Sequence, residues 1–303
     1  MTMINPSDPR HSQLAFGVTL VLVSYSLQRQ KLTWPGVAVA FFTALLHISF
    51  PSPVPFAGLV TFFLAGTIAT RIGKTIKSGY TVSATGGSGA EGPRNAAQVL
   101  ANSGTASIFI LLSFVASYTG FDALSTVAVG KPGAPLTDHV LVTRAVFGVA
   151  CSYAAAAADT LSSELGILAT GSPFLIIPPF RKVPRGTNGG VTIVGLAAGL
   201  LGGSIIAAVH YYAHQDITRA AVVAILGLGG SLLDSVLGAI AQATVEDKAT
   251  GKVVEGANGR RVLATKGGSR VKAGRDLLNN NGVNFVMALS IGMTGLVLDG
   301  VLR

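Results

Sequence analysis

Eight apolar segments divide the chain, and each is long enough to approach the thickness of a bilayer. They cover residues 12–28, 34–50, 54–70, 95–118, 140–162, 191–213, 219–242 and 283–302. A helix needs about 20 predominantly apolar residues to cross the hydrocarbon core. The first three segments are short and closely spaced, so one of them could re-enter the membrane without crossing it. The sequence therefore predicts an all-α, polytopic transmembrane helix bundle of six to eight spans.

Composition supports this class of fold. Only 12% of the residues are charged, against roughly a quarter in a typical soluble domain. The 38 glycines favour close approach of helices, as small residues do in membranes. We therefore expect small-residue helix packing within a single integral membrane domain, residues 1–303. Residues 71–94 and 243–282 are expected to be polar loops.

The distribution of basic residues predicts the orientation in the membrane. Seventeen of the 22 lysines and arginines follow odd-numbered apolar segments. Basic loops mark the cytosolic side, so the loops 71–94 and 243–282 are predicted to be cytosolic and both termini non-cytosolic. The same distribution accounts for the net charge of +9. No basic stripe is interleaved with aromatic residues, so we expect no nucleic-acid partner.

Five polar motifs reach the predicted cytosolic face, whereas the opposite loops contain nothing comparable. The motifs are RNAAQVLANSG (94–104), AADTLSSELG (157–166), VPRGTNGGVT (183–192), GGSLLDSVLGAIAQ (229–242) and LLNNNGVNF (277–285). They are far apart along the chain but are predicted to converge at one end of the bundle. We therefore expect a single site there.

Three carboxylates in these motifs are candidate ligands and catalytic groups. An ionised Asp at bilayer depth costs about 2.5–3.5 kcal/mol, so Asp159 and Asp234 each require a partner or a function. Asp234 shares a helix face with Gly230 and Gly238, and a purely packing role is the alternative. Glu164 lies about 140° from Asp159 around an ideal helix. It joins the same ion only if the helix loosens; otherwise it is an exposed helix end.

The candidate phosphate-binding residues lie in the other motifs. Backbone N–H groups of a glycine-rich stretch at a helix start form an anion site, and a turn with an N-cap is the competing interpretation. The asparagine run that begins the last segment also has two interpretations: its amides bind the ligand, or it forms a turn with a cap. The candidate residues for binding substrate or nucleotide are Arg94, Asn102, Arg185, Gly186, Asn188, Gly189 and Asn280.

Carboxylates beside basic residues suit a divalent cation that holds a polyphosphate. Mg²⁺ takes one or two carboxylates and leaves its other positions to phosphates and water. The sequence thus predicts a Mg²⁺ site formed by Asp159 and Asp234, with Glu164 as a further candidate ligand.

The five motifs, in this order, resemble those of the transmembrane protein 19 family, and the resemblance covers most of residues 54–302. This family includes the plant and cyanobacterial phytyl-phosphate kinase of vitamin E synthesis. The resemblance implies an integral membrane protein that transfers phosphate from a cytosolic nucleoside triphosphate to an isoprenyl monophosphate. Within the matched motifs, we infer catalytic roles for Asp159, Asp234 and Arg94.

Two other functions are compatible with the same residues. The carboxylates could bind a cation or relay protons in a transporter, with Asp299, His210 and His214 on the opposite side. The chain could also be a membrane protein without catalytic activity.

Overall fold

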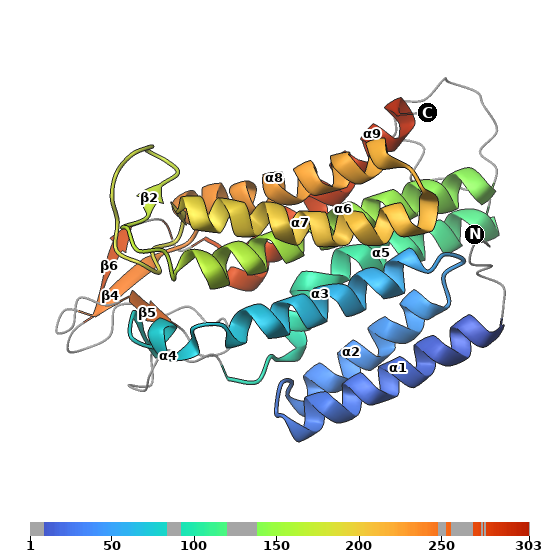
Figure 1. The fold of residues 1–303 in the computed structure, drawn as a ribbon, viewed down its shortest axis with the longest axis horizontal. Coiled ribbons are helices and arrows are strands. Elements are labelled where there is room, and N and C mark those ends of the chain that lie inside the picture. Colours follow the sequence, from blue (N-terminus) through green and yellow to red (C-terminus); the bar gives the residue numbers. More distant parts are fainter. Residues whose placement is uncertain are drawn as a thin grey trace.

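The computed structural model describes residues 9–83, 92–119, 138–247, 253–255, 269–273, 275 and 277–302. Long helices dominate these residues and run side by side (Figure 1). The helices are α1 (Pro9–Gln28), α2 (Trp34–Ile48), α3 (Val54–Arg71), α4 (Lys74–Lys77), α5 (Ala96–Thr119), α6 (Asp138–Gly166), α7 (Ile193–His214), α8 (Ile217–Ala241) and α9 (Asn280–Val301).

Each of the eight predicted spans corresponds to one helix in the described part of the chain. Six of these helices, α3 and α5 to α9, are long and apolar enough to cross a membrane. Helix α2 is apolar but has only 15 residues, and α1 has 20 residues with a polar first turn. The predicted polytopic all-α architecture is therefore confirmed.

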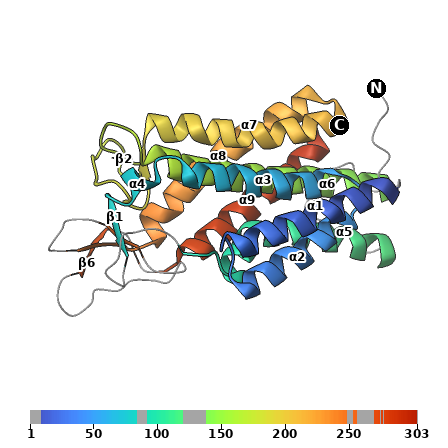
Figure 2. The same ribbon diagram turned by 60° about the horizontal axis from the view of Figure 1, so that its bottom comes forward.

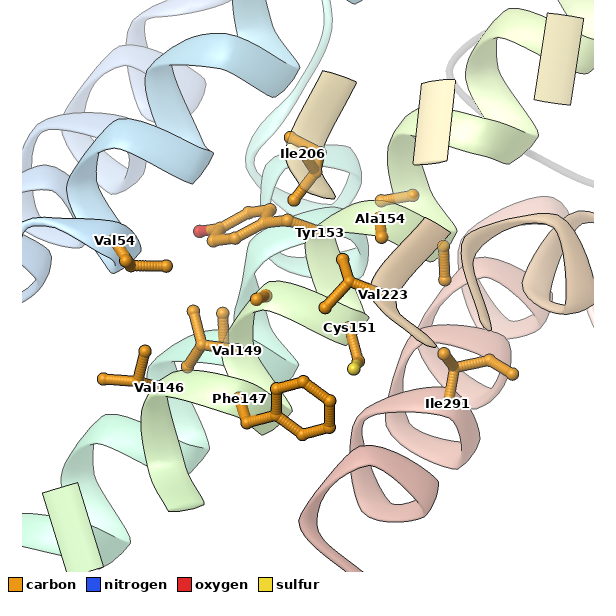
Figure 3. Close-up of a cluster of buried hydrophobic side chains, with 14 of the residues drawn as sticks. Val54, Val146, Phe147, Val149, Cys151, Tyr153, Ala154, Ile206, Val223 and Ile291 are labelled. Carbon is orange, nitrogen blue, oxygen red and sulfur yellow. The ribbon is translucent and has the colours of Figure 1, made fainter. Parts of the chain in front are cut away.

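Helix α6 lies at the centre of the bundle, where it contacts α3, α5, α7, α8 and α9. Every residue in 144–158 of this helix is buried. Figure 3 shows Phe147 of α6 in the same apolar cluster as Val223 of α8 and Ile291 of α9. Because lipid tails are as apolar as these side chains, close packing holds such helices together more than exclusion of water does.

Small residues allow α7 and α8 to approach α6 closely. A Cβ atom placed on Gly202 of α7 would lie 2.6 Å from the carbonyl oxygen of Ala157. On Gly230 of α8 it would lie 2.5 Å from the Cβ of Ala155. Any larger side chain at these glycines would separate the helices, so the alanine run of α6 and the facing glycines set the interhelical spacing.

Short strands gather at one end of the bundle, and most of them lie in the two segments that the sequence predicted only as polar loops. One four-stranded sheet has the order β1-β5-β4-β6, in which β1 and β5 are parallel and the other pairs antiparallel. A two-stranded antiparallel sheet joins β2 and β3. The strands are β1 (Thr81–Ser83), β2 (Phe174–Leu175), β3 (Gly190–Val191), β4 (Thr244–Asp247), β5 (Val253–Glu255) and β6 (Ser269–Ala273).

The bundle therefore has two distinct ends. Figures 1 and 2 show α6 and α8 ending, and α7 and α9 starting, at the end that carries the strands, which we call the polar end. The start of α1 and the end of α9 lie at the opposite end. This arrangement brings the five polar motifs to the polar end.

Candidate functional site

Helices α6 and α8 carry the two carboxylates to the same level of the bundle. The helices run in parallel and end together at the polar end (Figure 1). They touch where Ala155 of α6 meets Gly230 of α8. Asp159 and Asp234 each follow these contact residues by four positions, which is about one helical turn. The matching register therefore places the two carboxylates side by side.

The carboxyl groups of Asp159 and Asp234 are close enough for their charges to interact. Both residues are half-buried. Within the described part of the chain, neither carboxylate forms an ion pair with lysine or arginine. Two like charges at such a position repel each other and lose hydration. The pair is therefore suited to bind a cation or to share a proton.

Asn284 of α9 connects the carboxylate pair to α5. In the amide orientation that satisfies both of its polar atoms, Nδ2 donates to Asp234 Oδ2 at 3.2 Å and to the carbonyl oxygen of Asn280 at 3.0 Å. In the other orientation, Nδ2 donates to Asn102 Oδ1 at 3.4 Å. Asn102 thus lies near the pair. The exposed Asn280 side chain accepts a hydrogen bond from Gln242 at 3.5 Å.

Arg94 is held by the backbone at the entrance to α5. Its N–H donates to the carbonyl oxygen of Lys31, and its own carbonyl oxygen accepts from the N–H of Thr33. Its guanidinium reaches α3, where Nη1 lies 3.9 Å from the position of a Cβ on Gly66. The methyl group of Thr160, which follows Asp159 on α6, lies 3.4 Å from the same position. Arg94 therefore points toward the level of the carboxylates.

Several cations, including Arg94, lie near Lys31 at the polar end. Burial lowers the pKa of Lys31 from its usual value, and the charges of Arg71, Lys74 and Arg94 lower it further. Lys31 lies between α1 and α2, outside the spans. Burial lowers a lysine pKa because it disfavours the charged form, and nearby positive charges act in the same direction. We call Lys31, Arg71, Lys74 and Arg94 the basic cluster, and it is suited to bind an anion with several charges.

Glu164 does not join the other two carboxylates. Its side chain forms an ion pair with Lys77 of α4 and accepts a hydrogen bond from Thr70 Oγ1 at 3.1 Å. Helix α6 continues regularly to Gly166, so Glu164 stays on a different face from Asp159. Its predicted role as a metal ligand thus finds no support in its position, although a structural role does.

The glycine-rich stretch between β2 and α7 packs on the end of α8. Gly186 and Gly189 have positive φ angles of 82° and 78°. Asn188 donates through Nδ2 to the carbonyl oxygen of Ala243 at 3.2 Å. These interactions are structural, and the start of α7 is capped by the hydroxyl of Thr192, which accepts from Gly195 N–H at 2.9 Å.

Arg185 in the same stretch has a different environment. Its guanidinium lies over the ring of Tyr80, 4.4 Å from the centroid. Its Nη1 donates weakly to the carbonyl oxygen of Ile167 at 3.4 Å. Among the described residues, no carboxylate forms an ion pair with Arg185.

The donors around Asp159 and Asp234 fit Mg²⁺ better than a softer metal. They are carboxylate and amide oxygens, which are hard ligands. No group of three His, Cys, Asp or Glu side chains that could hold a metal occurs within the described residues. Two carboxylates nevertheless suffice for Mg²⁺ when phosphates complete its coordination.

Sequence reasoning missed Asn284 and three members of the basic cluster. Asn284 follows Asn280 by four residues, so its position on the same helix face was a usable signal. Lys31, Arg71 and Lys74 belong to the loops whose basic residues indicate orientation, and the sequence does not single them out from the other basic residues that could meet head groups or phosphates. Their convergence depends on how α1, α3 and α5 pack, which no local pattern reveals.

A polar pocket of about 270 Å³ lies at the opposite end of the bundle. Arg219 links two carboxylates there, at 2.6 Å from Asp216 and 3.0 Å from Asp299. The rings of His210 and His214 are 4.7 Å apart. The pocket is lined by His210, His214 and Asp299, which are the residues that the transporter alternative requires.

The fold and the site define a polytopic α-helical membrane protein with a carboxylate pair and a basic cluster at one end. The chain belongs to the DUF92 family of integral membrane proteins, which matches residues 17–292. This result confirms the family that the five motifs indicated.

Individual relatives support the family assignment over most of the chain. Protein PGR of Arabidopsis thaliana is 32% identical over 294 residues, which cover 91% of this chain and 93% of that protein. Protein VTE6, chloroplastic, of the same plant is 27% identical over 241 residues, covering 79% and 65%. An uncharacterized membrane protein of Methanocaldococcus jannaschii is 32% identical over 182 residues, covering 60% and 63%. No solved structure matches the chain significantly.

Proposed function

We propose that this protein is a Mg²⁺-dependent phosphotransferase that uses a nucleoside triphosphate to convert an isoprenyl monophosphate into the diphosphate. The observation that carries the proposal is the carboxylate pair of Asp159 and Asp234. Among the described residues they have no ion-pair partner, and they lie at the same end of the bundle as four clustered cations. Such a combination fits a metal ion and a polyphosphate. The resemblance of the five motifs to a family with a phytyl-phosphate kinase suggests the lipid substrate.

In this proposal, a phosphate oxygen of the lipid attacks the γ-phosphorus of the nucleotide. A new P–O bond forms, the bond from the γ-phosphorus to the β–γ bridging oxygen breaks, and the nucleoside diphosphate leaves. When bound, Mg²⁺ neutralises charge that develops on the transferred group. Asp159 and Asp234 would hold it, while Arg94 binds phosphate oxygens.

The remaining residues bind and orient the substrates. Lys31, Arg71 and Lys74 attract the polyphosphate, and Arg185 lies on the side of the glycine-rich stretch. The amides of Asn102 and Asn284 donate hydrogen bonds to phosphate or to Asp234. Catalysis of phosphoryl transfer depends chiefly on such positioning and charge stabilisation.

The proposal includes the orientation of the bundle, with the polar end in the cytosol and both termini on the other side. The nucleotide would then reach the site from the cytosol. The only cysteine, Cys151, is buried, so single cysteines introduced at residues 29 and 215 report on each side. Labelling of residue 29 by an impermeant maleimide from outside intact cells would reverse the proposed orientation.

The test is a reconstituted assay. Purified protein in nanodiscs is incubated with Mg²⁺, a panel of nucleoside triphosphates, and phytyl or farnesyl phosphate, and diphosphates are measured by mass spectrometry. The Asp159→Asn and Asp234→Asn variants should lose at least about a hundredfold in rate, as removal of charge-stabilising groups typically does. Asp216→Asn is the matched control, because Asp216 caps the start of α8 at the opposite end and Asn also caps helices.

Two results would count against the proposal. Correctly inserted Asp159→Asn and Asp234→Asn proteins that keep full activity would show that the carboxylate pair is not catalytic. Absence of diphosphate with every nucleotide and both lipids would reject the reaction itself.

A transport function is the second candidate, because His210, His214 and Asp299 line a pocket at the opposite end. Between the two ends, however, residues 144–158 of α6 are all buried. Ion or proton flux in proteoliposomes without nucleotide would favour this candidate over the kinase.

A further inference from the structure

A groove runs along the bundle between α1, α2, α3 and α5, with a volume of about 100 Å³. Most of its lining is apolar, for example Leu22 of α1, Ala44 of α2 and Phe63 of α3. The lining of α3 extends from Phe56 to Phe63, which corresponds to about 10 Å at 1.5 Å per residue. The groove is therefore long and narrow.

The wall of the groove on the side of α5 is partly polar. Arg94, Gln98 and Asn102 line this wall, and Arg94 lies two residues before the start of α5. No acidic side chain lines the groove within the described residues. The charge of Arg94 is thus presented next to an apolar channel. This combination complements an amphiphile with a single apolar chain and an anionic head.

The α5 wall of the groove also adjoins the carboxylate pair at Asn102. Asn102, which lines the groove, lies within hydrogen-bonding distance of Asn284 at 3.4 Å. The same Asn284 amide reaches Asp234 at 3.2 Å in its alternative orientation. An anionic head bound by Arg94 and Asn102 would therefore lie one side chain away from the proposed metal site.

We infer that this groove binds the apolar tail of a prenyl monophosphate and places its phosphate at Arg94 and Asn102. The inference rests on the proposed function for its choice of ligand and deepens it by assigning the substrate's position. The tail lies between α1, α2 and α3, away from the α6–α7–α8 contacts. The width of the groove at α2 then limits which chains can enter.

The test is photo-crosslinking to the whole protein in nanodiscs, without nucleotide. The probe is farnesyl monophosphate with a diazirine on its terminal isoprene unit, and labelled peptides are mapped by mass spectrometry. Labels are expected within residues 19–26 and 56–63, and farnesyl phosphate should compete better than farnesol. Labels confined to α7 and α8 would overturn the inference. The experiment uses the wild-type protein, so it does not depend on whether a variant folds.

A matched pair of variants tests the same point. Ala40 lines the groove, whereas Ala38 on the same helix is exposed and does not. Ala40→Phe should reduce labelling about tenfold, equivalent to about 1.4 kcal/mol, while Ala38→Phe should label like the wild type. Equal labelling of the two variants would contradict the inference.

The two proposals fail in different ways. Labels in the groove without formation of diphosphate would retain the binding site and reject the kinase reaction. Formation of diphosphate with labels elsewhere would retain the reaction and reject the groove.

Discussion

Replacing Gly230 with alanine should separate α6 from α8 and displace Asp234 from Asp159. The added Cβ would lie 2.5 Å from the Cβ of Ala155 and 2.9 Å from its Cα. Both neighbours belong to the buried centre of α6, where no flexible side chain can move aside. The two helices must therefore move apart.

The size of the effect follows from these distances. Carbon atoms pack best at about 3.5–4.0 Å, so the backbones must separate by about 1 Å. Overpacking of this kind costs about 1–3 kcal/mol of stability. A displacement of about 1 Å in a catalytic arrangement can lower the rate about a hundredfold. Activity should therefore suffer more than folding.

Gly229→Ala provides the control, because a Cβ on Gly229 meets no atom within 4 Å. Both substitutions gain the same helix propensity, up to about 1 kcal/mol. The difference between them isolates the contact with Ala155. Unfolding is followed by circular dichroism in mixed detergent micelles, and phosphotransfer is measured by mass spectrometry.

The result that refutes this reasoning is a Gly230→Ala protein that matches Gly229→Ala in both measurements. Agreement within about 0.5 kcal/mol, the usual range for surface changes, would mean that α6 and α8 are not packed through Gly230. The register that pairs the two carboxylates would then be wrong as well.

Glu164→Gln should destabilise the protein by about 1–3 kcal/mol, less than the cost of about 3–5 kcal/mol for fully buried pairs, because Lys77 and Glu164 are 13% and 19% exposed. The Mg²⁺ concentration that gives half-maximal activity of this variant should not change. An increase would support the original prediction that Glu164 is a metal ligand. For Lys31, whose pKa is lowered, stability of the nucleotide-free protein should rise with pH between this lowered pKa and about 10.4. Lys31→Gln should abolish that rise and should weaken nucleotide binding, as monitored by the melting temperature with and without ATP. A variant with the same pH profile as the wild type would show that Lys31 is not destabilised by its burial and its basic neighbours. Asn284→Ala should lower activity about 10–100-fold, as loss of a residue that orients a metal ligand does, whereas Asn281→Ala should not; equal rates would remove Asn284 from the site.

The sequence alone determined the class of fold and the segments that form it. All eight predicted spans became helices because the length of an apolar block is a local property that the bilayer selects. The alternation of basic and weakly charged loops likewise indicated which polar motifs share one end. Asp159 and Asp234 stood out because an isolated carboxylate within a span is costly.

Only the tertiary structure decided which side chains meet. The pairing of Asp159 with Asp234 depends on the register of α6 against α8, which is set by the contact of Gly230 with Ala155. Glu164 turns to Lys77 because the regular helix carries it to another face. The convergence of Lys31 and Arg94, and the small sheet between distant loops, likewise arise from contacts between segments that no periodicity within one segment encodes.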